Sequence, residues 1–464
     1  MSLSAWTLAG IACTLLLIVG VSLYSGSKVK NAADFTSGGQ KASTAVVAGA
    51  IMGTLVGGSS TIGTAQLAYN YGLSAWWFTL GGGIACLILA LCYARPMRAT
   101  GCPTVVGMLS REFGKNVGMV ASVLSSLGIF INIISQLLAA TAVIAIICPG
   151  LDIFASVALA AALMALYVIF GGFLGAGLVG IVKLVLLYVS VIAGGGIALA
   201  ISGGFGPLTS TLDPVRYFNL FARGVSTDGG ACLSLILGVV CTQSYAQALL
   251  AGKTDRAAQK GALISAAMIP PIGVGGIIIG LFMRVNHPDL ASAKLAFPRF
   301  VTQYMPDFLG GVVLAALLIA VVGTGAGLSL GISSVVNNDI VKKLTHKLDD
   351  PKRNLIFTRV FIVIALAAAC LLSTGALGDT ILTFAFMSMG LRGAVIFVPL
   401  CCALWAPGKL DCRWAMACVV VGPALTLAFG LTNILPFDSL FAGVAAALLC
   451  CAAGLVAGRH VAHC

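Results

Sequence analysis

The chain has 464 residues, of which 59% are hydrophobic and only 9% are charged, with 26 Lys and Arg against 14 Asp and Glu. Soluble domains contain about 25% charged residues, so a soluble enzyme, a nucleic-acid-binding protein and a disordered protein are excluded. The 15 cysteines lie mostly in apolar runs, where they act as small hydrophobic residues. With only four His, we expect neither a metal cluster nor an organic cofactor. The composition predicts a multi-pass integral membrane protein whose surroundings are the lipid bilayer, with no nucleic-acid partner.

A membrane-spanning helix needs about 20 apolar residues, and thirteen segments meet this requirement. In chain order they are 4–25, 43–69, 73–95, 116–147, 152–172, 175–204, 228–252, 258–284, 309–336, 355–375, 380–404, 413–430 and 438–457. No positively charged stretch precedes 4–25, so we expect a retained helix there and not a cleaved signal. The sequence therefore predicts an all-α membrane protein with about 13 transmembrane helices in a single polytopic domain over 1–464.

The basic residues are distributed unequally between the loops on the two sides of these spans. One set of alternate loops holds 19 Lys and Arg and the opposite set holds 5. Because positive loops face the cytoplasm, we expect the N-terminus outside, the C-terminus in the cytoplasm, and a bacterial inner (plasma) membrane as the location. The two remaining basic residues, Lys183 and Arg392, lie inside predicted spans.

Two predicted spans contain polar interruptions in the middle of the membrane. The second, within Ala50–Gly63, includes two adjacent glycines and three hydroxyl residues at Gly57–Thr61, and the seventh includes Cys241–Gln247. Unwound backbone at this depth is tolerated where it lines a cavity or is packed by protein, and paired broken helices indicate the binding site of a secondary transporter. Residues 43–204 and 228–404 would then form two five-helix repeats of inverted topology. The alternative is that these small residues only allow close helix packing.

Four stretches in chain order resemble the sodium:solute symporter family, which includes proline, pantothenate, sialic acid and galactose transporters. They are Gly57–Gly63 with Ala68–Leu73, Tyr167–Gly172 at the family's loop between helices five and six, Thr242–Lys253, and Ser333–Ile340. The resemblance implies a leucine-transporter-like fold, with a 5+5 inverted repeat, a leading helix at 4–25 and two trailing helices within 413–457.

The resemblance also implies a sodium site between the second and ninth helices. Its ligands map to the carbonyl oxygens of Gly53, Val56 and Ala320 and to two side-chain hydroxyls at positions 323 and 324. Thr324 has the hydroxyl, but Gly323 has none. The family's sixth helix usually carries Asp and, three residues later, Gln; the matching residues here are Gly180 and Lys183.

Lys183 is a hypothesis for function because a lysine at the centre of a membrane helix costs at least about 2.5 kcal/mol. Either it spends part of its time as the neutral amine, since burial disfavours the charged form, or its ammonium occupies the place of sodium. In both cases transport would be proton-coupled or uncoupled. The alternative is that Lys183 extends to a water-filled cytoplasmic vestibule.

Arg392 could grip a substrate carboxylate with two hydrogen bonds, or it could hydrogen-bond unwound backbone or lie in the outer or inner vestibule. Two buried cations without a buried acid favour an anionic or zwitterionic solute. The other candidate substrate-binding residues are polar groups at membrane depth, each of which is equally compatible with an interhelical hydrogen bond: Ser59, Ser60, Thr61, Gln66, Asn132, Gln136, Thr242 and Gln243.

These observations predict a secondary active transporter that moves a small organic solute by cation-coupled symport, with Na⁺ or H⁺ as the coupling ion. The alternative is a proton-coupled or uncoupled transporter in which Lys183 replaces sodium. A channel would need more polar positions along the spans, and an enzyme would need a nucleophile–base pair or an acidic metal motif within the membrane. The sequence does not indicate the oligomeric state.

Overall fold

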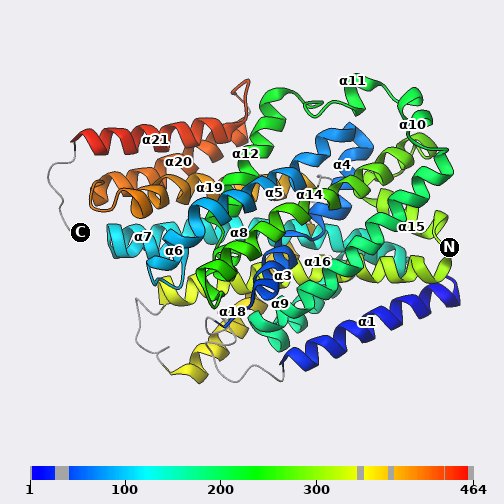
Figure 1. Ribbon diagram of the computed structural model, residues 1–464, viewed down its shortest axis with the longest axis horizontal. Coiled ribbons are helices and arrows are strands. Elements are labelled where there is room, and N and C mark those ends of the chain that lie inside the picture. Colours follow the sequence, from blue (N-terminus) through cyan, green and yellow to red (C-terminus); the bar gives the residue numbers. More distant parts are fainter. Residues whose placement is uncertain (1–2, 27–40, 342–349, 375–380, 433, 458–464) are drawn as a thin grey trace.

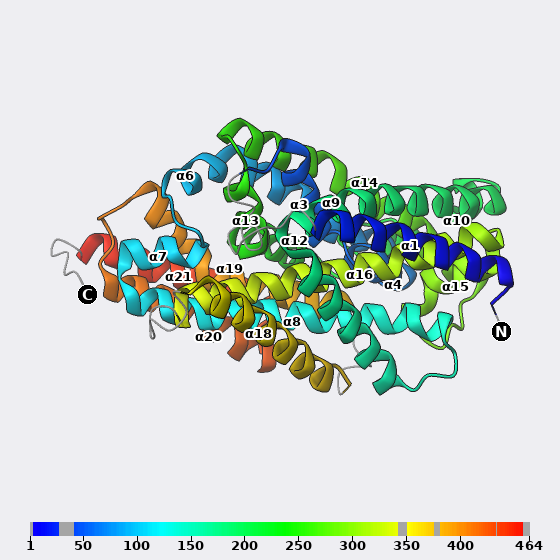
Figure 2. The same ribbon diagram turned by 90° about the horizontal axis from the view of Figure 1, so that it is seen from below.

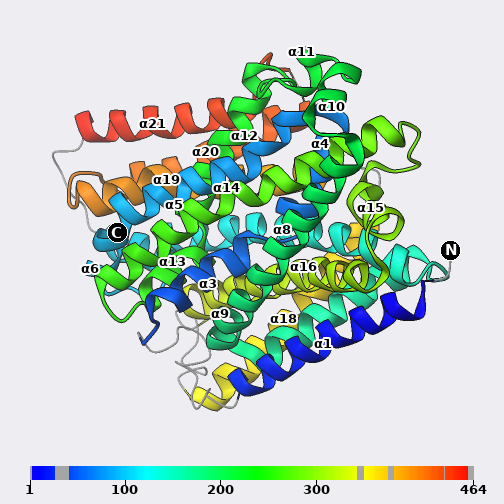
Figure 3. The same cartoon turned by 45° about the vertical axis from the view of Figure 1, so that its right-hand side comes forward.

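The computed structural model describes residues 3–26, 41–341, 350–374, 381–432 and 434–457; within these ranges the side chains of 22–26, 169–179, 338–339, 351–352 and 431 are not described. The regular structure of the described residues is helical apart from an isolated bridge between Ala42 and Gly252. Figure 1 shows long helices lying side by side, with α20 (Cys412–Thr432) and α21 (Ser439–Ala457) along one edge. The leading helix α1 (Ala5–Gly26) runs along the opposite edge, and Figure 3 shows the same arrangement.

The first half of the chain contains the elements α3 (Thr44–Leu55), η2 (Ser59–Gly63), α4 (Thr64–Tyr71), η3 (Gly72–Trp76), α5 (Trp77–Ile88), η4 (Leu89–Tyr93), α6 (Ala94–Ala99), α7 (Val105–Phe113), α8 (Lys115–Ile147), α9 (Ile153–Ser202), α10 (Phe205–Thr211) and α11 (Pro214–Tyr217). The second half contains α12 (Val225–Cys241), α13 (Gln243–Ala251), α14 (Asp255–Asn286), η5 (Ala293–Leu295), α15 (Ala296–Tyr304), α16 (Asp307–Val335), η6 (Val336–Val341), α18 (Pro351–Ser373) and α19 (Ile381–Trp405). Short polar residues cap several helices and satisfy backbone N–H groups that have no partner in the first turn, as Ser43, Thr104, Asp152 and Thr254 do.

Within the described residues, nine helices are long and apolar enough to cross a membrane, or ten if the bent pair α12 and α13 is one span. The all-helical membrane architecture is therefore confirmed, whereas the number of thirteen spans stays a prediction. The predicted spans 152–172 and 175–204 both fall within α9, a helix of 50 residues, of which Gly180–Ser202 is long and apolar enough to cross a membrane and Ile153–Val168 is a shorter apolar helix. The stretch Tyr167–Gly172 is helical, and the boundary between the two spans stays a prediction.

The two predicted interruptions are both present. The second span breaks between Leu55 and Ser59, and the seventh bends by 46° between α12 and α13 at Thr242. Figure 2 shows α16 passing between α8 and α9, and α16 contacts both of these helices. The centre of the molecule is therefore built by the two broken helices together with α8, α9, α16 and α19.

Glycines allow close helix crossings at the periphery. A Cβ at Gly10 of α1 would lie 2.3 Å from the carbonyl oxygen of Phe308 in α16, and a Cβ at Gly311 would lie 2.0 Å from that of Thr7. Such small-residue contacts are how membrane helices pack when lipid and side chains are equally apolar. They attach the leading helix α1 to the core helix α16.

Candidate functional site: a lysine at the broken second span

The break in the second span is a short extended segment whose backbone groups are satisfied by the hydroxyl residues that follow it. Val56 has φ −87° and ψ 98°, so the helix ends there. The hydroxyls of Ser60 and Thr61 donate to the carbonyl oxygen of Gly57 at 3.0 and 2.8 Å, and Ser60 Oγ accepts the Gly57 N–H at 2.8 Å. The hydroxyls of Ser60 and Thr61 therefore stabilise the unwound backbone. This structural role is the alternative to binding the solute that the sequence predicts.

Position 57 requires glycine because another helix approaches it closely. A Cβ there would lie 2.3 Å from Thr324 Oγ1 of α16 and 2.9 Å from Gln136 Oε1 of α8. The missing side chain lets the threonine hydroxyl come within 3.3 Å of the carbonyl oxygens of both Gly53 and Val56. Three of the groups that the family resemblance implies as sodium ligands therefore converge at the break.

The amine of Lys183 lies among these oxygens. Nζ donates to the carbonyl oxygen of Gly53 at 2.6 Å and to Thr324 Oγ1 at 2.9 Å, and the side chain is 1% exposed. These are the short distances of charge-assisted hydrogen bonds. In the described part of the chain, no carboxylate forms an ion pair with Lys183. The lysine is thus held by neutral oxygen atoms, the same ligand type that a hard cation prefers.

Gly323 and Ala320, the other implied ligands, lie on the same helix as Thr324 and are buried. A Cβ at Gly323 would meet Lys183 Cδ at 3.7 Å and the Tyr167 hydroxyl at 3.5 Å, which are ordinary van der Waals distances. The lysine stem therefore packs beside the position where the family's second hydroxyl would stand. A serine at 323 would nevertheless have room for its Cβ.

The absent aspartate at position 180 has a steric explanation. A Cβ at Gly180 would lie 2.3 Å from the carbonyl oxygen of Gly49 and 3.4 Å from the Cα of Gly53. The helices α9 and α3 cross in direct backbone contact at this point, so no side chain fits. This crossing brings Lys183, one turn later on α9, within hydrogen-bonding distance of the break.

Arg392 lies at the other broken helix and is fully buried. Its Nη1 donates to Thr242 Oγ1 at 2.7 Å, Nη2 donates to Ser388 Oγ at 2.7 Å, and Nε donates to the Ser388 carbonyl oxygen at 3.0 Å. Gly128 of α8 packs against its stem, since a Cβ there would lie 2.6 Å from Arg392 Cγ. The guanidinium is thus bonded to Thr242 at the α12–α13 bend, and its role toward a substrate carboxylate stays a prediction.

A second polar cluster joins η2 to α8. Gln136 Nε2 donates to Ser59 Oγ at 3.0 Å, Gln136 Oε1 accepts the Gly58 N–H at 3.0 Å, and Ser59 Oγ lies 3.2 Å from Ser135 Oγ. Asn132, one turn earlier on α8, reaches Gln136 at 3.5 Å. These candidate residues are brought together beside the break and Lys183's ligand Thr324. Gln66 lies apart from them, where its Oε1 accepts the Ile381 N–H at 3.1 Å.

Gln243 serves a different contact from the one predicted. Its Oε1 accepts the Val105 N–H at 2.9 Å and its Nε2 donates to the Pro103 carbonyl oxygen at 3.2 Å. Arg98 donates to the carbonyl oxygens of Leu249 and Leu250, at 2.9 and 3.1 Å. These bonds attach α13 to the segment before α7 and to α6, on the side predicted to be cytoplasmic. The sequence around Gln243 contains no pattern that predicts its contact with the segment before α7.

Several functional neighbours were not among the predicted residues. Ser388 precedes Arg392 by one helical turn, and Ser135 is adjacent to Gln136, so helical spacing could have indicated both. Asp228, in the first turn of α12, is 0% exposed and pairs with Arg223 at 2.6 Å, and Ser74 Oγ also donates to its carboxylate at 2.8 Å. The network formed by Ser74, Arg223 and Asp228 lies on the predicted outer side.

Comparison with known proteins assigns this chain to a family. Residues 35–422 match the sequence model of the sodium:solute symporter family. The chain belongs to that family. It is 23% identical to the sodium/pantothenate symporter of Escherichia coli, with 90% of this chain and 89% of that protein covered. It is 24% identical to the high-affinity choline transporter 1 of Caenorhabditis elegans, with 89% and 76% covered.

Solved structures show the same fold. A substrate-bound, outward-open Na⁺-coupled sialic acid symporter superimposes with a TM-score of 0.82 at 16% identity, covering 98% of this chain and 97% of that one. Mhp1, a nucleobase-cation-symport-1 family transporter, superimposes with a TM-score of 0.63 at 12% identity, covering 90% and 93%. Family membership makes the chain a multi-pass membrane transporter and not an enzyme, and it makes sodium the coupling ion of the family.

Proposed function

We propose that this protein is a secondary active transporter of a small organic solute in which the ammonium of Lys183 takes the place of the sodium ion. The observation that carries this proposal is the pair of contacts from Lys183 Nζ, 2.6 Å to the Gly53 carbonyl oxygen and 2.9 Å to Thr324 Oγ1. Both are ligands that the family resemblance implies for sodium. Transport would then not require sodium, although sodium is the coupling ion of the family.

The charge inventory supports a carboxylate or zwitterion as the solute. Lys183 and Arg392 are both buried, and neither forms an ion pair with a carboxylate among the described residues. Burying charge without a partner is costly, so an anionic group that enters the centre would be stabilised beside either of them. The polar cluster of Ser59 and Gln136 beside the break supplies further hydrogen-bonding groups.

Lys183 joins three helices, because it extends from α9 to Gly53 on α3 and Thr324 on α16. Alternating access requires such contacts to differ between the outward-facing and inward-facing states. If the amine releases its proton during the cycle, transport is proton-coupled. If it stays charged, transport is uncoupled. The proposal includes the inverted 5+5 repeat, the thirteen spans, an inner-membrane location and the orientation predicted from the charged loops.

The test begins with a thermal-stability screen of carboxylates and amino acids, because a bound ligand stabilises the folded state by mass action. Uptake of the stabilising solute is then measured in proteoliposomes with potassium replacing sodium, with and without a pH gradient. We expect uptake at the same rate in both salts. Concentration of solute driven by the pH gradient indicates proton coupling, and equilibration alone indicates uncoupled transport.

Strict dependence of wild-type uptake on sodium, retained unchanged in Lys183→Ala, would refute the proposal. For the solute class, Arg392→Gln should abolish binding of carboxylates and keep binding of neutral analogues if the arginine contacts the solute. Unchanged selectivity in a folded Arg392→Gln variant would remove the arginine from the solute site and leave the structural contact to Thr242.

A further inference from the structure

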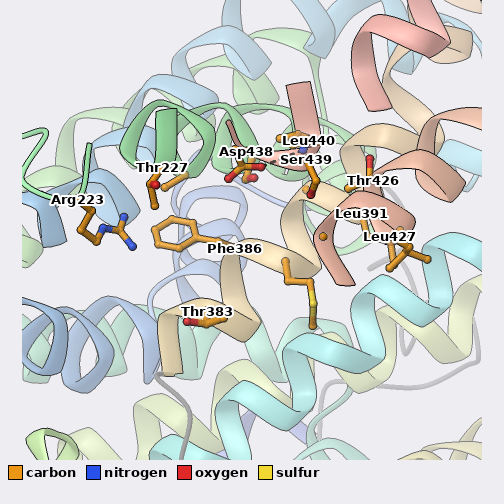
Figure 4. A pocket seen from close by; sticks show the side chains of 15 residues that line it. Arg223, Thr227, Thr383, Phe386, Leu391, Thr426, Leu427, Asp438, Ser439 and Leu440 are labelled. Carbon is orange, nitrogen blue, oxygen red and sulfur yellow. Dashed lines mark hydrogen bonds between the residues drawn. The ribbon is translucent and has the colours of Figure 1, made fainter. Parts of the chain in front are cut away.

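A cavity of about 290 Å³ lies away from Lys183, between the first halves of α12 and α19 and the ends of α20 and α21 that face them. Figure 4 shows Arg223 beside the ring of Phe386, with Thr227 above them and Asp438 and Ser439 coming from the α21 side. All four helix ends are on the predicted outer side. The trailing helices, which lie outside the predicted repeats, therefore form a pocket with two of the helices that build the transport site.

The pocket is lined by one basic and one acidic side chain, Arg223 and Asp438, but Arg223 is already paired with Asp228 behind the lining. Arg223 Nη2 lies 2.6 Å from Asp228 Oδ1 and Nε lies 2.8 Å from the same oxygen, so these two residues neutralise each other. The guanidinium also lies 5.7 Å from the centre of the Phe386 ring. What remains is one carboxylate, that of Asp438, and thus a net charge of −1 at the pocket.

Asp438 is held in place by both of the helices beside it. Its Oδ1 accepts the N–H of Leu440 at 2.9 Å, and its own N–H donates to Ser226 Oγ at 2.8 Å. A Cβ at Gly230 would lie 2.3 Å from Oδ2, so this glycine in α12 makes room for the carboxylate. Among the described residues, no basic side chain lies within ion-pair distance of it. Burial raises the pKa of the Asp438 carboxyl above its usual value, although the Leu440 N–H and the charge of Arg223 oppose this shift.

The rest of the lining is mostly apolar and includes Phe386, Leu391, Leu427 and Leu440. An apolar pocket with one fixed charged group is the usual form of a small-molecule site. We propose that this pocket binds a small organic amine, with its ammonium at Asp438 and its apolar part against Phe386 and the leucines. This site is separate from the transport site and does not depend on how transport is coupled.

The experiment uses the purified full chain in lipid nanodiscs and 2-phenylethylamine as the probe. The uncharged 2-phenylethanol and the anion phenylacetate have a similar size and serve as controls. We expect the amine to raise the unfolding temperature in a saturable way and the two controls to have at least tenfold weaker effects at equal concentration. Equal stabilisation by the alcohol would show an apolar or lipid site only, and stronger stabilisation by phenylacetate would place the uncompensated charge on Arg223; either result overturns the proposal.

Two variants locate the binding. Asp438→Asn keeps the size of the side chain and an acceptor for the Leu440 N–H, and we expect at least tenfold weaker amine binding. Thr227 lines the pocket and is exposed, so Thr227→Trp narrows the entrance without changing the carboxylate and should weaken binding independently. Lys183→Gln is the control for the transport site and should leave amine binding unchanged. Unchanged affinity in both pocket variants would refute the assignment.

Discussion

Replacing Lys183 with glutamine should create sodium binding where the wild-type protein has none. Glutamine is the residue that the family usually has at this position, and it removes the ammonium while keeping a polar side chain. A sodium ion that shares the Gly53 carbonyl oxygen would lie about 4 Å from Nζ, and two unit charges at this distance repel by about 4 kcal/mol at an effective dielectric constant of about 20. Removing that repulsion corresponds to a roughly 1,000-fold gain in sodium affinity.

The assay is thermal unfolding of the purified protein in sodium chloride and in potassium chloride of equal concentration, which needs no knowledge of the solute. Sodium at a hundredfold excess over Kd stabilises the folded state by about 2.7 kcal/mol. Wild-type protein should unfold at the same temperature in both salts, and Lys183→Gln should be more stable in sodium. Adding Gly323→Ser restores the family's second hydroxyl and should strengthen the response, since its Cβ meets Tyr167 and Lys183 only at van der Waals distances.

The matched control is Lys260→Gln, which removes the same charge from an exposed position on α14 and should leave both salts equivalent. The reasoning would be refuted if wild-type protein and Lys183→Gln responded identically to sodium. It would also be refuted if wild-type protein were already stabilised by sodium as strongly as the double variant is.

Three further outcomes follow from the packing and the charges. Gly180→Ala should lower the free energy of unfolding by about 1–3 kcal/mol because its Cβ meets a backbone oxygen at 2.3 Å. The control Gly196→Ala lies on the same helix, where its Cβ meets nothing within 4 Å, and should be neutral or stabilising. Chemical denaturation in detergent measures the free energy of unfolding of both variants. Arg392→Gln should cost about 3 kcal/mol in the same measurement because it leaves buried hydrogen-bonding groups without their charged partner, and Met389→Leu, which removes only a sulfur acceptor, should cost less. Because burial raises the pKa of Asp438, its carboxylate is protonated at a higher pH than usual. Binding of 2-phenylethylamine should therefore weaken as the pH falls through that raised pKa. Binding titrations at several pH values check this, and an affinity that does not change with pH would contradict it.

The sequence predicted the helical architecture and the two broken spans because both depend on composition and local polarity. The apolar runs set most helices to within a few residues, and Gly57, Gly58 and the following hydroxyls marked the first break. The boundary expected between the spans 152–172 and 175–204 falls inside α9, which is helical from Ile153 to Ser202.

The site could be predicted only as far as residue types allow. Lys183 was singled out as a charge within a span, and one of its two expected arrangements placed the ammonium at the cation ligands. The Gly49–Gly180 crossing, which brings the lysine there, depends on the distance between α3 and α9, and no local pattern encodes that distance. For the same reason the contact from Gln243 to the segment before α7, and the pocket at Asp438, became visible only in three dimensions.

The ammonium of Lys183 is covalently attached to the backbone through its side chain, so each protein molecule has one such charge. A covalently attached group has an effective local concentration that the surrounding medium does not change. A dissolved ion must instead be captured again in every cycle, at a rate set by its abundance outside the cell. The oxygen atoms of Gly53 and Thr324 would therefore be equally occupied in fresh water and in brine, and the working range of this transporter would be set by the supply of its solute and not by the salinity of its habitat.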